Sequence, residues 1–100
     1  MSPSQAARLA ERIAAAVADC PSVARLAAGP IATYLPGRTV PGVAVREDRV
    51  RIAVVAAFGP PMAEVAEQVR AAARKVVPDL PIDVAIEDVE VPAATVGADS

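Results

Sequence analysis

One stretch limits the fold of this chain more than any other: RVRIAVVAAF, Arg49 to Phe58, which is apolar on both faces of the strand it predicts. Its β-branched residues favour a strand, and successive side chains of a strand point to opposite faces. One face carries Val50, Ile52, Val54, Ala56 and Phe58. The other carries Arg51, Ala53, Val55 and Ala57. A half-exposed antiparallel strand would alternate apolar and polar residues, so we expect both faces to be covered.

The second face has two possible covers. The segment from Ala27 to Gly42 is long for a structureless connection, and it could fold over this face. Alternatively, another protein subunit covers it, as exposed apolar patches often mark interfaces. We therefore predict self-association or a partner surface that includes Arg51, Ala53 and Val55.

Two amphipathic helices are predicted on either side of this strand in the sequence. Ser4 is expected to cap the first helix, and Pro21 ends it. Its apolar positions recur every three or four residues, at Ala6, Leu9, Ile13, Ala16, Val17 and Cys20. The second helix follows Gly59-Pro60-Pro61, since proline suits a first turn, and stops at Pro78. Its predicted stripe is Met62, Val65, Val69, Ala72 and Val76.

Further strands complete the predicted sheet. Ser22 to Leu26 is expected to be a short strand, and Val43 to Val45 pairs with Arg49 to Phe58 in a hairpin. After the second helix, a strand begins at Ile82 and its apolar phase slips near Glu87-Asp88, which indicates a β-bulge. The strands before and after this helix form a β-α-β unit, whose crossover is right-handed if they lie parallel in one sheet.

These elements predict an α+β domain over residues 1–92. We expect a small single sheet of about four strands, one hairpin plus the β-α-β unit, with two helices packed on it and the order α-β-β-β-α-β. Residues 93–100 are expected to be a disordered tail because they are small and polar and lie at a terminus.

Composition and charge exclude several classes of function. The 100 residues carry a net charge of −2 and only two aromatic side chains, Tyr34 and Phe58. Nucleic-acid binding needs clustered cations and aromatic platforms, so we expect no nucleic-acid partner. No apolar run reaches the roughly 20 residues that span a bilayer, and the first residues lack the order of a signal peptide. We expect a cytoplasmic protein without direct membrane insertion.

The chain has few reactive groups. Cys20 is the only cysteine and there is no histidine, which excludes an internal disulfide, a cysteine metal cluster and a histidine-activated nucleophile. The sequence has no phosphate-binding glycine motif and no calcium-loop spacing. We therefore predict no enzymatic activity, no catalytic residue, no cofactor and no metal site. The arginines around the hairpin, Arg38, Arg46, Arg49 and Arg51, are expected to pair with the acids of the last strand, Asp83, Glu87, Asp88 and Glu90. The alternative is that these arginines form a basic patch that contacts anionic lipid.

The stretch TYLPGRTVPGV, Thr33 to Val43, contains the only tyrosine and two Pro-Gly pairs. Proline and glycine in Leu35-Pro36-Gly37-Arg38 stand where a type II turn needs them, so Ile31 to Leu35 is expected to pair with Arg38 to Val40. One interpretation is a purely structural turn. The other is a projecting loop that binds a protein through Tyr34, Leu35 and Arg38, since tyrosine and arginine are enriched at interfaces.

The order of these stretches resembles a known family. CPSVARLAAG follows a helix, then come VPGVAVREDRVRIAVVAAFGPPMAEVAEQVRAAARKVV and LPIDVAIEDVEV. Over Ala6 to Val91 the chain resembles the alkaline shock protein family, also called the envelope stress response or glucose-starvation general stress family. Longer members carry a long polar tail that these 100 residues do not show. The element Thr33 to Thr39 resembles an insertion in short versions that look actinobacterial.

The resemblance implies a non-enzymatic bacterial envelope stress response protein that acts through protein–protein contacts, with scaffolding near the cytoplasmic face of the membrane. Its implied partners are further copies of itself or a membrane-anchored family protein, which would make it membrane-peripheral. The alternative is a small-molecule-sensing or regulatory α+β module with a ligand between sheet and helices. An RNA-binding domain of the KH kind would need a basic Gly-x-x-Gly loop, which the sequence lacks.

Overall fold

Two helices and six strands make up the described part of the chain, residues 2–35 and 37–91. In chain order they are α1 (Pro3–Ala18), β1 (Val23–Leu26), β2 (Ala32–Leu35), β3 (Arg38–Pro41), β4 (Val43–Val45), β5 (Val50–Ala57), α2 (Met62–Arg74) and β6 (Ile82–Glu90). This computed structural model is α+β, as the sequence predicts. The tail predicted over 93–100 lies outside the described residues.

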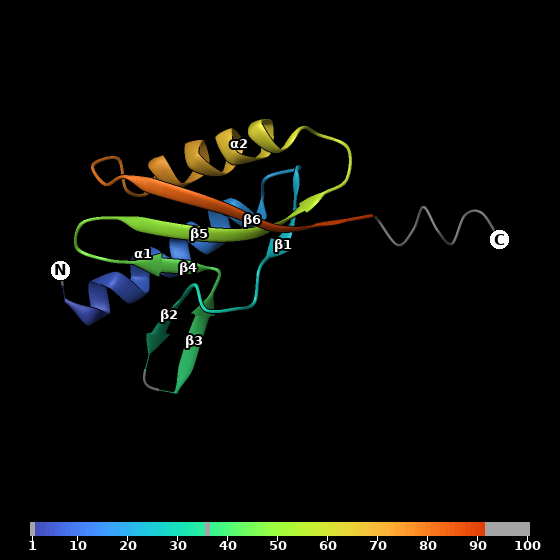
Figure 1. Ribbon diagram of the computed structural model, residues 1–100. Coiled ribbons are helices and arrows are strands. Elements are labelled where there is room, and N and C mark those ends of the chain that lie inside the picture. Colours follow the sequence, from blue (N-terminus) through green and yellow to red (C-terminus); the bar gives the residue numbers. More distant parts are fainter. Residues whose placement is uncertain (1, 36, 92–100) are drawn as a thin grey trace.

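β5 is the central strand of a four-stranded sheet (Figure 1). β6 runs parallel to it along one edge, from Val50 to Ala57. β4 and β1 share the other edge end to end, both antiparallel: β4 lies opposite residues 50–52 and β1 opposite residues 54–56. The hairpin of β4 with β5 and the β-α-β unit are thus confirmed. A second, two-stranded sheet of β2 and β3 adds to the predicted single sheet.

The predicted β-bulge lies in β6. Val54 is opposite Ile86 and Val55 is opposite Asp88, so Glu87 is the extra residue. An extra residue in one strand shifts the alternation of its side chains. As a result Val89, opposite Ala56, packs against the same core as Ile86 although the two are three residues apart.

Both helices cover one face of the sheet. Their buried side chains form one core with the inward residues of β4, β5 and β6: Ala10, Ile13, Val17, Val65, Val69, Ala73, Val43, Val50, Ile52, Val54, Ala56 and Ile82. The stripe of α2 differs from the prediction, because Met62 is exposed and Ala73 replaces Ala72 at the centre. Positions four apart rotate by only about 40° around a helix, so Val65, Val69 and Ala73 form one ridge toward the core.

The first helix begins two residues earlier than predicted. Ser2, not Ser4, is its cap: the Ser2 hydroxyl accepts from the Gln5 amide at 3.2 Å, and the Ser2 amide donates to the Gln5 side chain at 2.9 Å. This reciprocal pair is a capping box, and Pro3 occupies the first helical position, where its missing N–H costs nothing.

Candidate interaction surface

The stretch around Tyr34 folds as a hairpin of its own, β2 with β3, which projects from the main sheet (Figure 1). Its register pairs Tyr34 with Thr39 and Leu35 with Arg38, as predicted. Gly37 has a φ of +80°, the value that a type II turn requires at its third residue. Pro36 and the side chains of Leu35 and Arg38 lie outside the described part of the structure.

Thr33 attaches this hairpin to the main sheet. Its hydroxyl donates to the Val43 carbonyl at 2.7 Å and accepts from the Val45 amide at 3.3 Å. The Val43 carbonyl and the Val45 amide face away from β5, because the amide and carbonyl of Ala44, the residue between them, point toward β5. One hydroxyl therefore satisfies two groups on the free edge of β4, an edge that would otherwise be open to another strand. The hairpin is a fixed part of the fold.

Tyr34 itself faces solvent, with 70% of its surface exposed. It borders a cleft of about 300 Å³ where the hairpin, the end of β4 and the start of α1 meet. The cleft is lined by Pro3, Ala6, Pro30, Ala32, Thr33, Tyr34, Ala44, Val45 and Arg46. An exposed aromatic ring beside a shallow cleft and an arginine is the residue combination common at protein interfaces.

The start of α1 adds no anion site to this cleft. Three of the first four residues cannot offer a free amide: Pro3 has none, the Gln5 amide donates to Ser2, and the Ala6 amide donates to the Ser2 carbonyl at 3.0 Å. A helix start binds anions through such free amides. The cleft therefore offers both apolar and polar surface, with Arg46 among its lining residues.

The second face of β5 is covered by the chain's own Ala27–Gly42 segment. Ala53 and Val55 are only 1% and 4% exposed, and they cluster with Ala27 and Ile31. Ala53 holds both ends of the segment: its carbonyl accepts from the Ala27 amide at 2.9 Å, and its amide donates to the Gly42 carbonyl at 2.8 Å. Of the two covers the sequence left open, the chain's own segment is the one observed.

Gly42 makes this close approach possible. Its φ is +80°, and a Cβ there would meet the Ala53 carbonyl oxygen and the Leu26 Cβ, each at 2.9 Å. Real Cβ atoms do not come so near to backbone, so a side chain would push the segment away from β5.

The predicted surface residues are thus divided. Tyr34 and Arg51 are exposed, whereas Ala53 and Val55 are buried and present nothing to a partner in this conformation. Arg51 is opposite Ala44, which lines the Tyr34 cleft from the main sheet. The accessible candidate site is therefore the hairpin surface, by which we mean Tyr34 and the cleft with Arg46.

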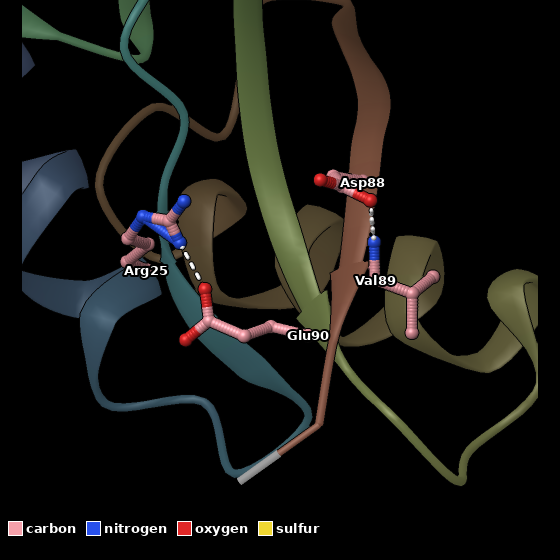
Figure 2. A network of polar contacts seen from close by, with 4 residues as sticks. All are labelled: Arg25, Asp88, Val89 and Glu90. Atoms are coloured by element: carbon pink, nitrogen blue, oxygen red, sulfur yellow. Dashed lines mark hydrogen bonds and ion pairs between the residues drawn. The ribbon is translucent and has the colours of Figure 1, made fainter. Parts of the chain in front are cut away.

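Charged pairs link β6 to its neighbours. Arg49 lies 3.6 Å from Asp83, which confirms one of the predicted pairs. Arg25 of β1 contacts Glu90 at 2.5 Å across the end of β5 (Figure 2). The sequence analysis missed Arg25, because its 65-residue separation from Glu90 leaves no local signal. All four side chains are about half exposed, where such pairs contribute at most about 1 kcal/mol.

Reactive chemistry is sparse in the described residues. No group of three His, Cys, Asp or Glu side chains in residues 2–35 and 37–91 could hold a metal ion. The Cys20 thiol donates weakly to the carbonyls of Ala16 and Gln68, at 3.8 and 3.7 Å. Burial and the Asp19 carboxylate raise its pKa, with Lys75 opposing them, so the thiol stays protonated and poorly nucleophilic at neutral pH.

A second exposed apolar group was not predicted. Phe58, Met62 and Val91 are all exposed. The amide of Phe58 donates to the Glu90 carbonyl, which brings Val91 to the same end of the sheet. The exposure of Phe58 could have been predicted from the Phe58-Gly59-Pro60-Pro61 sequence. A strand that runs directly into a proline turn leaves its last side chain without a helix to cover it.

Comparison of the chain with protein-family models, with curated proteins and with solved structures found no match. No helix among the described residues is long and apolar enough to cross a membrane.

Proposed function

We propose that this chain is a non-enzymatic envelope stress response protein that acts by binding another protein through the hairpin surface. The observation that carries the proposal is the 70% exposure of Tyr34 on a hairpin that Thr33 holds in place. The assignment to envelope stress depends on the resemblance of Ala6 to Val91 to the alkaline shock protein family.

The fixed position of the hairpin favours binding. A tyrosine ring offers a large contact area at a low entropic cost, because it has only two rotatable side-chain bonds. Ordering a free loop on binding would cost further free energy, and the bonds of Thr33 to β4 have already met that cost in the unbound protein. The neighbouring cleft could receive one apolar side chain of a partner, with Arg46 at its rim.

The expected partner is a membrane-anchored family protein or a further copy of the chain, located at the cytoplasmic face of the membrane. Because the apolar face at Ala53 and Val55 is already covered, such a contact would have to use the exposed surface. The alternative function, binding of a small molecule between sheet and helices, has little support: Ile13, Ile52 and Val69 fill that space and are fully buried.

Affinity capture tests the proposal. The tagged chain, a Tyr34→Ala variant and a Thr39→Ala variant would be incubated with solubilised membranes of the producing cell, and recovered small membrane proteins quantified by mass spectrometry. The recovered partner would then be purified and titrated. Thr39 is the matched control, because it is exposed and directly opposite Tyr34.

We expect Tyr34→Ala to weaken partner binding about tenfold or more, as loss of an aromatic hot spot does, and Thr39→Ala to change it less than about twofold. Equal affinity of the three proteins would contradict the proposal. A clear thermal shift with one metabolite, and no recovered protein, would favour the small-molecule alternative instead.

A further inference from the structure

The outer edge of β6 is open in its middle. β6 bonds to β5 on one side only, and no strand of the described residues pairs with its other side. The Val50 amide donates to the Pro81 carbonyl, so residues 81, 83 and 85 point their backbone groups toward β5. The amides and carbonyls of Ile82, Val84 and Ile86 therefore face outward.

Both ends of this edge are closed by side chains of the same protein. The Arg70 guanidinium donates to the Ile82 carbonyl at 3.4 Å. Beyond the bulge, the Asp88 carboxylate accepts from the Val89 amide at 2.8 Å (Figure 2). Such devices prevent unwanted strand pairing, and here the two contacts lie on either side of the outward backbone groups of Val84 and Ile86.

Negative charge surrounds the open part. β6 carries four acids and no basic residue: Asp83, Glu87, Asp88 and Glu90. Arg49 neutralises Asp83, and Arg25 neutralises Glu90. Glu87 and Asp88, which directly follow Ile86, form no ion pair with any described residue. Unneutralised carboxylates and open backbone groups thus lie next to each other.

We propose that the Val84–Ile86 edge of β6 binds an extended basic segment of another protein, which adds to the sheet as a further strand. Backbone groups of Val84 and Ile86 would bond to the segment, and its Lys or Arg side chains would pair with Glu87 and Asp88. A second copy of β6 is a poor occupant, because its own unneutralised carboxylates would meet like charges. This edge is independent of the Tyr34 hairpin surface.

The test uses a short peptide of alternating valine and lysine, titrated into the labelled protein at low salt and followed by backbone NMR. We expect the largest shifts at the Val84 and Ile86 amides and slower hydrogen exchange there. The same peptide N-methylated at every residue keeps its charges but has no free amide on either edge, so it should bind about tenfold more weakly.

Charge reversal provides the second arm. Glu87→Lys should weaken binding about tenfold, whereas Glu64→Lys, the same charge change on the exposed start of α2, should have less than about a threefold effect. Equal binding of the methylated and unmethylated peptides, equal effects of the two reversals, or pairing of β6 with a second copy in the absence of peptide would each overturn the proposal.

Discussion

Replacing Thr33 by valine would remove the hydroxyl that attaches the hairpin to β4 while keeping the shape and β-branching of the side chain. Two hydrogen bonds would be lost: the short one to the Val43 carbonyl at 2.7 Å and the longer one from the Val45 amide at 3.3 Å. Both are partly buried, so water would replace them incompletely.

The expected loss of stability follows from these two contacts. A hydrogen bond contributes about 0.5–1.5 kcal/mol net, so the pair accounts for about 1–3 kcal/mol. The extra methyl of valine, half-buried, returns about 0.4 kcal/mol. We expect a fall of about 0.6–2.6 kcal/mol in the free energy of unfolding, or roughly 2–20 °C in Tm for a domain of this size.

Urea denaturation followed by circular dichroism would measure the effect, with Thr39→Val as the matched control on the exposed side of the same hairpin. The control should change stability by less than about 0.5 kcal/mol. The Val45 amide should also exchange faster in the Thr33→Val protein. If the two variants were equally stable, the hairpin would not be held by the Thr33 hydroxyl, and the argument for a fixed Tyr34 surface would fail.

Three further results are expected. Gly42→Ala should lower stability by about 2 kcal/mol or more, because Gly42 has a positive φ and a Cβ there would make contacts at 2.9 Å. Gly29→Ala is the control: a Cβ there would have nothing within 4 Å, so stability should change by less than about 0.5 kcal/mol in the same denaturation assay. Ser22→Ala should cost about 1–2 kcal/mol because the nearly buried hydroxyl donates to Gln68 at 2.6 Å, and Gln68→Ala should then add little in a double-mutant cycle. Burial raises the pKa of the Cys20 thiol in the folded state above its usual 9.0, so the unfolded chain loses this proton first as the pH rises. The stability of the wild-type protein should therefore fall relative to that of Cys20→Ala above about pH 9. Equal pH profiles of the two proteins would contradict the burial of this thiol.

Local periodicity was sufficient for much of the fold. The two apolar faces of β5 required a cover on each side, and the structure has both. The phase slip predicted a bulge near Glu87-Asp88, because alternation is a property of a single strand, and the structure has the extra residue at Glu87. The Pro-Gly pair after Leu35 predicted the hairpin register, since turn chemistry is equally local.

The cap of α1 could have been predicted from the sequence, whereas several tertiary contacts could not. Ser2 and Ser4 are equally good caps by residue type, and Pro3 between them decides for Ser2 because proline suits the position after the cap. Whether Ala53 is covered by the chain's own segment or by a partner depends on long-range packing, as does the contact of Arg25 with Glu90. The hydroxyl of Thr33 on the edge of β4 likewise has no local signature.

Hydrogen exchange of the Ala27 and Ala53 amides, measured over a range of protein concentrations, tests the central claim most directly. These amides donate to Ala53 and Gly42 and hold the two ends of the segment beside β5, so that Ala27 and Ile31 pack against Ala53 and Val55. The account predicts strong protection of both amides in a dilute, unassociated protein, unchanged as the concentration rises. Rapid exchange in the dilute protein, with protection only where the chain associates, would show that another subunit and not this segment covers β5.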